Sequence, residues 1–120
     1  MQKKVMKVLD MALKSVFFEP VRNGAKKTEF RDFTDYWCNK LLDVESYHMS
    51  TDDIINGLLD GTLEIKPRGW THILFHESGH NRTVLVEMGE IRTYPGHRAF
   101  CIDLGDVIED NGRKVERKDK

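Results

Sequence analysis

N-G-A-K-K-T-E-F-R-D, residues 23–32, is the stretch that decides the fold, because it joins a tight turn to a short strand. Gly24 suits the exit of a helix, where the backbone often turns left-handed. From residue 27 onward the pattern alternates with a period of two, so Glu29 and Arg31 share one strand face. That face is either an exposed ladder of charges or the wall of a pocket.

Upstream of this stretch the sequence predicts a strand and a short helix. Residues 4–13 are rich in apolar side chains, and their pattern allows a strand or a helix; the helix that follows favours the strand. Ser15 can cap that helix, which continues through V-F-F-E-P-V-R-N and stops at Gly24. Pro20 limits its length because proline has no N–H to donate.

Downstream the sequence predicts two helices and then a β-rich third. Residues 34–43 form the first helix, and Ser50, with Asp53 three residues later, begins a second helix that Gly61 ends. Three strands follow, and the first two pair as a hairpin. Their expected ranges are 70–77, 82–94 and 98–104, with a bulge or bend at Gly89 in the longest one.

This order of elements predicts an α+β fold with a small, strongly curved sheet or barrel. The 120 residues suffice for one domain with a real core, which we expect over residues 1–110. Residues 111–120 are strongly charged and have little to bury, so a flexible tail is expected there.

Composition limits the classes of protein and of partner. Hydrophobic residues make up 39% of the chain and charged residues 32%, which is typical of a soluble globular protein. The formal net charge of −1 supplies no global field toward nucleic acid or acidic lipid. No apolar run approaches the ~20 residues of a membrane helix. The two cysteines, Cys38 and Cys101, lack a disulfide framework and indicate a reduced, cytoplasmic protein.

The spacing Gly24-x-Lys26-x-x-Glu29-x-Arg31 brings a cation, a carboxylate and a planar donor fork to one place. Lys26 lies where the chain turns into the strand, and the Cβ atoms of Glu29 and Arg31 are expected to be about 7 Å apart. Such a set suits a planar polar ligand, either a nucleobase or a nucleotide that carries phosphate. The alternative is a surface ion-pair ladder that contributes little.

This pattern resembles the G-x-K-x-x-E-x-R signature of the ASCH domain, a member of the PUA-like superfamily. The segments F-F-E-P-V-R-N, W-T-H-I-L-F, V-L-V-E-M-G-E-I and F-C-I-D-L-G-D-V-I are similar to other elements of that family, so the resemblance covers roughly residues 5–108. It implies a β-barrel of five to six strands with helices at its ends and a ligand cleft beside the signature strand. Proteins of this superfamily are thought to bind RNA or modified nucleotides there.

The resemblance also implies a possible chemistry. Some ASCH proteins hydrolyse the amide of acetylated cytidine, and ribonuclease activity is described in the family. Those amidohydrolases resemble this chain at Gly24, Lys26 and Arg31. Their nucleophilic threonine falls where this sequence has Glu29, and Thr28 lies on the opposite strand face. An enzyme here would therefore use Glu29 as a general base on water, with Lys26 holding the oxyanion.

Three further residues are expected to contribute to ligand binding. Tyr36 follows the signature by one short turn and can offer a stacking surface. His76 can donate to a phosphate or a base at the rim of the cleft, and Arg82 can extend a basic rim. His76 also lies midway between His72 and His80; four-residue spacing suits a metal on a helix, but the pattern here predicts a strand, so no metal site is expected.

The expected partner is therefore RNA or a modified nucleotide, without a cofactor or a membrane, and a monomer is favoured. A small hydrolase of acylated nucleosides or of RNA is the first alternative. A protein-interaction scaffold without a ligand is the second. The acidic segment 43–64 has no Lys or Arg, and it either covers the cleft as a lid or closes one end of the fold.

Overall fold

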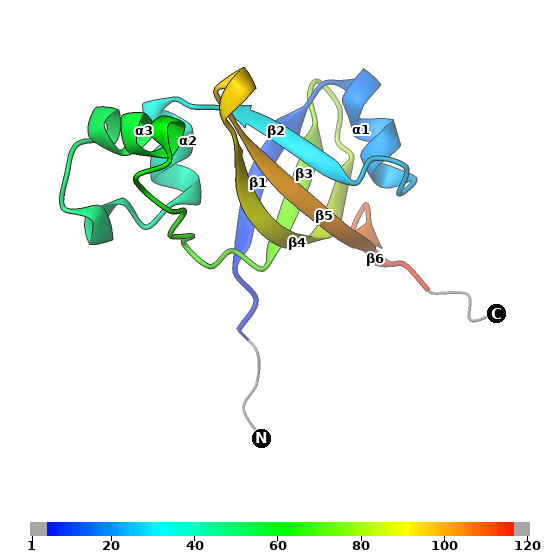
Figure 1. Cartoon of the computed structure of the whole chain (residues 1–120). Helices are drawn as coiled ribbons and strands as arrows, with labels where there is room; N and C mark the ends of the chain where they lie inside the picture. The colour runs from blue at the N-terminus through cyan, green and yellow to red at the C-terminus, as the bar shows by residue number, and fades with distance from the viewer. Residues whose placement is uncertain (1–4, 117–120) are drawn as a thin grey trace. The chain divides into compact units, whose positions relative to one another are not determined.

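Six strands and three α-helices form the α+β fold of this protein in a computed structural model that describes residues 5–116 (Figure 1). The predicted class is confirmed. The elements in chain order are β1 (Val8–Leu13), α1 (Ser15–Arg22), β2 (Thr28–Asp32), α2 (Asp35–Leu41), the 3₁₀ helix η1 (Val44–Tyr47), α3 (Thr51–Asp60), β3 (His72–Glu77), β4 (Thr83–Tyr94), the 3₁₀ helix η2 (Pro95–His97), β5 (Ala99–Asp110) and β6 (Arg113–Lys114).

The strands belong to one mixed sheet with the order β1-β3-β4-β5-β2, and β6 pairs with β5 beside this path. β1 runs parallel to β3, whereas β3 with β4 and β2 with β5 are antiparallel. The predicted hairpin of the third and fourth strands is confirmed. The path is open within residues 5–116, since no pairing joins its two ends, so the predicted barrel is not confirmed.

The chain groups into two units. Among the described residues, unit 1 comprises 5–27, 70–89 and 104–116, and unit 2 comprises 28–69 and 90–103. The boundaries fall inside β4, after Gly89, and inside β5, before Leu104, so both long strands contribute to both units.

Unit 1 is built where β1 and β3 pack against α1. The inward residues of β1 and β3 are buried in alternation, as a period of two requires. α1 buries Phe18 and Val21, whose exposed fractions are 0% and 1%. The helix ends where Gly24 adopts φ +80°, which confirms the predicted left-handed exit. The predicted cap at Ser15 was wrong: Lys14 occupies the cap position without a side-chain hydrogen bond, and Ser15 is the first helical residue.

Unit 2 is built from two capped helices and the paired strands β2 and β5. The Thr34 hydroxyl accepts from the Trp37 N–H at the start of α2, and the Ser50 hydroxyl accepts from the Asp53 N–H at the start of α3. The second cap was predicted from the sequence, and it removes one unsatisfied N–H from the helix end. The buried apolar residues of this unit include Phe33, Cys38, Leu41, Leu42, Ile54, Leu58, Phe100 and Ile102.

The C-terminal part differs in detail from the prediction. β5 runs on to Asp110, beyond the predicted end at residue 104, and the following residues turn back as β6. Within the expected tail, residues 111–116 are therefore partly ordered as a turn and a strand with exposed side chains, and residues 117–120 lie outside the described part. No helix in that described part is both long and apolar enough to cross a membrane.

Candidate functional site

In the strand β2 a charged side chain is buried and an aromatic side chain is exposed, the reverse of an ordinary surface strand. Glu29 is only 4% exposed, whereas the neighbouring Phe30 is 43% exposed. The alternation predicted from the sequence places Glu29 and Arg31 on one face, and the burial pattern of the strand agrees. The charged face of β2 is therefore the inward one, and the aromatic side chain points outward.

On that inward face Glu29 and Arg31 form an ion pair. The Arg31 Nη1 atom lies 3.1 Å from the Glu29 Oε1 atom and also donates to the Phe30 carbonyl at 2.8 Å. The same Glu29 oxygen accepts from the Phe30 N–H at 3.0 Å. The side chains are 5% and 17% exposed, so the pair is largely removed from water. This arrangement uses the carboxylate to orient the guanidinium.

The Arg31 guanidinium in turn begins a series of stacked groups on α2. Its Cζ atom lies 5.1 Å from the centroid of the Trp37 ring, and Trp37 meets Tyr36 edge-on at 4.9 Å and 88°. The Lys40 Nζ atom lies 5.7 Å from the Tyr36 centroid. These four residues, Arg31, Trp37, Tyr36 and Lys40, form the cation–aromatic ladder of unit 2.

The start of α2 explains the geometry of the ladder. Thr34 fixes the first turn, so Tyr36 and Trp37 project about 100° apart around the helix axis. Trp37 is therefore partly buried toward Arg31, while Tyr36 is 59% exposed. Lys40 follows Tyr36 by four residues and lies on the same helix face. The ladder thus runs from a nearly buried guanidinium to an open tyrosine and a surface ammonium.

The other two signature residues belong to unit 1. Gly24 is needed for its backbone conformation, since φ is +80° and a Cβ atom there would meet nothing within 4 Å. The Lys26 N–H donates to the Pro20 carbonyl at 2.9 Å, which ties the turn to α1. The Lys26 Nζ atom lies 5.2 Å from the centroid of the Phe17 ring. Lys26 is thus placed beside an aromatic ring of α1.

The predicted rim residues His76 and Arg82 both contact carboxylates of unit 1. The His76 Nε2 atom lies 2.8 Å from the Asp10 Oδ1 atom across β1 and β3. Arg82 lies 3.5 Å from Glu19 and 3.8 Å from Glu77, and its guanidinium stacks on the Phe18 ring at 5.3 Å. His76 therefore has a carboxylate hydrogen-bond partner, and Arg82 lies within ion-pair distance of two carboxylates.

Arg82 is part of a network that also includes Arg22. Arg22 donates to Glu19, and its Nη1 atom donates to Asp110 at 3.0 Å. These hydrogen bonds, first of all the one to Glu19, raise the pKa of the Arg22 guanidinium above its usual range. The hydrogen bond from Arg22 likewise lowers the pKa of the Glu19 carboxyl. The network joins α1 to β5 through the hydrogen bond from Arg22 to Asp110.

Sequence reasoning missed two features of these sites. Glu77, at the end of β3, is only 8% exposed and lies on the same strand face as the buried Ile73 and Phe75. The period of two in H-I-L-F-H-E could have predicted its burial. Lys40 was also missed as a partner of Tyr36, although the four-residue spacing on a helix is a usable signal. What the structure brings together within unit 2 is therefore Glu29, Arg31, Trp37, Tyr36 and Lys40.

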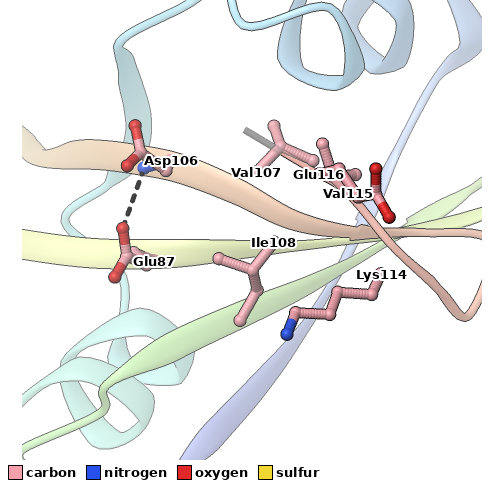
Figure 2. A pocket seen from close by; sticks show the side chains of 7 residues that line it. All are labelled: Glu87, Asp106, Val107, Ile108, Lys114, Val115 and Glu116. Carbon is pink, nitrogen blue, oxygen red and sulfur yellow. Dashed lines mark hydrogen bonds between the residues drawn. The ribbon is translucent and has the colours of Figure 1, made fainter. Parts of the chain in front are cut away.

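A separate hollow of about 620 Å³ lies beside β5 and β6 in unit 1 (Figure 2). The Asp106 N–H donates to the Glu87 Oε1 atom at 3.2 Å on one side of it, and Ile108 lies across its middle. Three carboxylates and one ammonium give the lining a net negative charge, which disfavours phosphate. The lining residues are Glu87, Asp106, Val107, Ile108, Lys114, Val115 and Glu116, and they include none of the predicted ligand-binding residues.

Among the described residues, no three His, Cys, Asp or Glu side chains gather as a metal site would require. Comparisons with protein-family models, with curated proteins and with solved structures gave no significant match.

Proposed function

We propose that this protein binds RNA or a modified nucleotide in the manner of an ASCH-type, PUA-like domain, with the cation–aromatic ladder as the central part of its binding surface. The observation that carries the proposal is the inward Glu29–Arg31 pair stacked on Trp37. We propose also that its sheet is the strongly curved sheet of a PUA-like domain and that the protein is cytoplasmic.

The cost of the pair supports a function beyond stability. Removing two charges from water is expensive, and an apolar pair of similar size often stabilises a fold as well or better. A row of exposed ion pairs, by contrast, keeps its charges in water and contributes little to stability. The Glu29 and Arg31 side chains are charged although they are largely buried. Because stability alone does not require such a pair, a binding role for the Arg31 guanidinium is favoured.

Each group of the ladder has a role that suits a nucleotide. Arg31 presents a planar donor fork, which matches phosphate oxygens or the acceptor edge of a base. Tyr36 is exposed and aromatic, so a base can stack on it. Lys40 supplies a second cation for phosphate at the outer end. Glu29 orients Arg31 or accepts from an exocyclic amine.

The test measures the binding of nucleoside monophosphates and of N4-acetylcytidine. Calorimetry gives the affinity, and the NMR signals of the backbone amides of residues 24–40 report the site. Arg31→Lys keeps the charge but loses the planar fork, so affinity should fall about tenfold, as expected for one lost charge-assisted hydrogen bond. The matched control is Arg92→Lys. Arg92 belongs to the same unit and forms an ion pair with Asp103. It also contacts Cys101, whose strand partner is the outward-facing Phe30, so Arg92 lies away from the inward face of β2.

The control variant should bind as the unchanged protein does. If none of these compounds moves the amide signals of residues 24–40, the proposal is wrong for mononucleotides and nucleosides. Turnover of N4-acetylcytidine that is lost in both Lys26→Ala and Glu29→Ala would replace the binding role with the hydrolase alternative.

A further inference from the structure

α1 presents an aromatic ring to solvent. Phe18 is fully buried, but the preceding Phe17 is 50% exposed and Val16 is 69% exposed. Successive helical residues project about 100° apart, so the inward direction of Phe18 turns Phe17 away from the core of unit 1. The Phe17 ring lies directly beside Lys26, a residue of the signature.

One cation lies against this ring, and a second is near it in sequence. The Lys26 Nζ atom lies 5.2 Å from the Phe17 centroid, and Lys14, the residue before α1, is exposed. Residues 14–27 carry four cations and one carboxylate, a net charge of +3 in a chain whose total is −1. That carboxylate, Glu19, pairs with Arg22 and Arg82, and Arg22 also pairs with Asp110, so the positive charge of this segment comes from its three lysines. Lys26 brings one of these charges to the Phe17 ring and favours an anionic ligand there.

We propose that Phe17 is a base-stacking residue for single-stranded nucleic acid, with Lys26 and Lys14 contacting the phosphates on either side of the stacked base. Exposed aromatic rings flanked by cations are the usual means by which proteins hold unpaired strands, because every base has a π-face and every linkage carries a charge. The inference rests on the proposed function and extends its ligand from one nucleotide to a strand.

An anionic membrane is the other partner that a basic, partly apolar surface suits, and the structure favours it less. Membrane-surface helices bury a long apolar face, commonly over many turns. α1 has eight residues, and its apolar positions Phe18 and Val21 are already used by the core. Only Val16 and Phe17 remain for lipid, whereas one ring suffices for one base.

The test uses a fluorescein-labelled oligouridylate of about ten nucleotides, a length within the usual range of a single-strand site. Phe17→Ala should weaken its binding roughly tenfold, the typical loss for one stacked base, and Phe17→Trp should retain it. Val16→Ala is the matched control, because it shortens a neighbouring exposed side chain without touching the ring, and its affinity should stay unchanged. Circular dichroism checks that each variant folds.

The outcomes separate this inference from the proposed function. If Phe17→Ala binds the oligonucleotide like the unchanged protein while Arg31→Lys weakens it, the stacking role is wrong and the nucleotide-binding role stands. If mononucleotides bind and the oligonucleotide gains nothing over them, the stacking role is again wrong. If neither binds, both fail. Co-sedimentation with vesicles that contain phosphatidylserine, lost in Phe17→Ala, would assign this surface to lipid instead.

Discussion

At the scale of single residues, the Glu29 carboxylate and the Arg31 guanidinium hold each other on the inward face of β2. The two groups form an ion pair, and each also makes a hydrogen bond with the Phe30 backbone, through its N–H and its carbonyl. Removing one partner leaves the other as a charge with little access to water. The two side chains are therefore coupled in energy, whatever ligand they serve.

Glu29→Ala should lower the free energy of unfolding by about 3 kcal/mol, because it removes the carboxylate that faces the Arg31 charge in a nearly buried place. Urea denaturation at neutral pH measures this value. Asp103→Ala is the matched control: it breaks the exposed pair with Arg92 and should cost less than about 1 kcal/mol. Equal losses in the two variants would show that Glu29 is not held as the structure describes.

The two cysteines offer a second prediction at this scale. Burial, with a smaller effect of Asp35, raises the pKa of the Cys38 thiol to about 11, and its side chain has no exposed surface. An unfolded cysteine titrates near 8.5, so the folded state keeps a proton that the unfolded state loses. Stability should therefore fall as pH rises from about 9 to 11, and Cys38→Ala should remove part of that fall.

Alkylation with iodoacetamide at pH 8 provides the readout for the individual thiols. Cys101 is 8% exposed and should react first, while Cys38 should react only on the timescale of unfolding. Faster labelling of Cys38 than of Cys101 in the native protein would contradict the burial of α2.

At the scale of elements, the sequence predicted the helix ends and the turn that depend on neighbouring residues. The Ser50 cap, the stop at Gly61 and the hairpin of β3 with β4 all follow from residues close together in sequence. Contacts between distant segments were not predictable in that way. The Tyr47 hydroxyl donates to the Glu64 carbonyl and accepts from the Lys66 N–H, and no local pattern announces η1 or this contact.

The candidate site follows the same division. The spacing predicted Gly24, Lys26, Glu29 and Arg31 as candidates, and the alternation of β2 predicted that Glu29 and Arg31 share a face, but not that this face points inward. The stacking of Arg31 on Trp37 depends on the angle at which α2 leaves the strand, which a period of two or 3.6 does not encode. His76 and Arg82 were predicted from residue type alone, and tertiary contacts with carboxylates decided their actual environment.

Gly57 supplies a prediction about α3. Alanine favours a helix over glycine by about 1 kcal/mol, so propensity alone predicts that Gly57→Ala stabilises the protein. A Cβ atom there would instead overlap the Cγ and Cδ1 atoms of Leu63, which packs back onto the helix. The melting temperature should therefore fall, with a loss of about 1–2 kcal/mol from overpacking. Asn56→Ala, at the exposed neighbouring position, should leave stability unchanged or slightly higher.

At the scale of the whole molecule, the charge is nearly balanced overall but uneven along the chain. The net charge is −1, yet residues 14–27 are basic, while the hollow beside β6 is lined by three carboxylates and one ammonium. Long-range attraction of a nucleic acid to the whole protein is therefore weak. Affinity must come from a few local cations, which limits how many counterions a bound strand can release.

This limit sets the salt dependence of oligonucleotide binding. If Lys14 and Lys26 each neutralise one phosphate of a single strand, the logarithm of affinity should fall against the logarithm of salt concentration with a slope of about −1.4. Lys26→Ala should make that slope shallower by about 0.7, because one fewer counterion is released. Lys114→Ala, a lysine beside the anionic hollow, should leave it unchanged. A steep slope shared by all three proteins would mean that binding spreads over many surface cations and has no defined site.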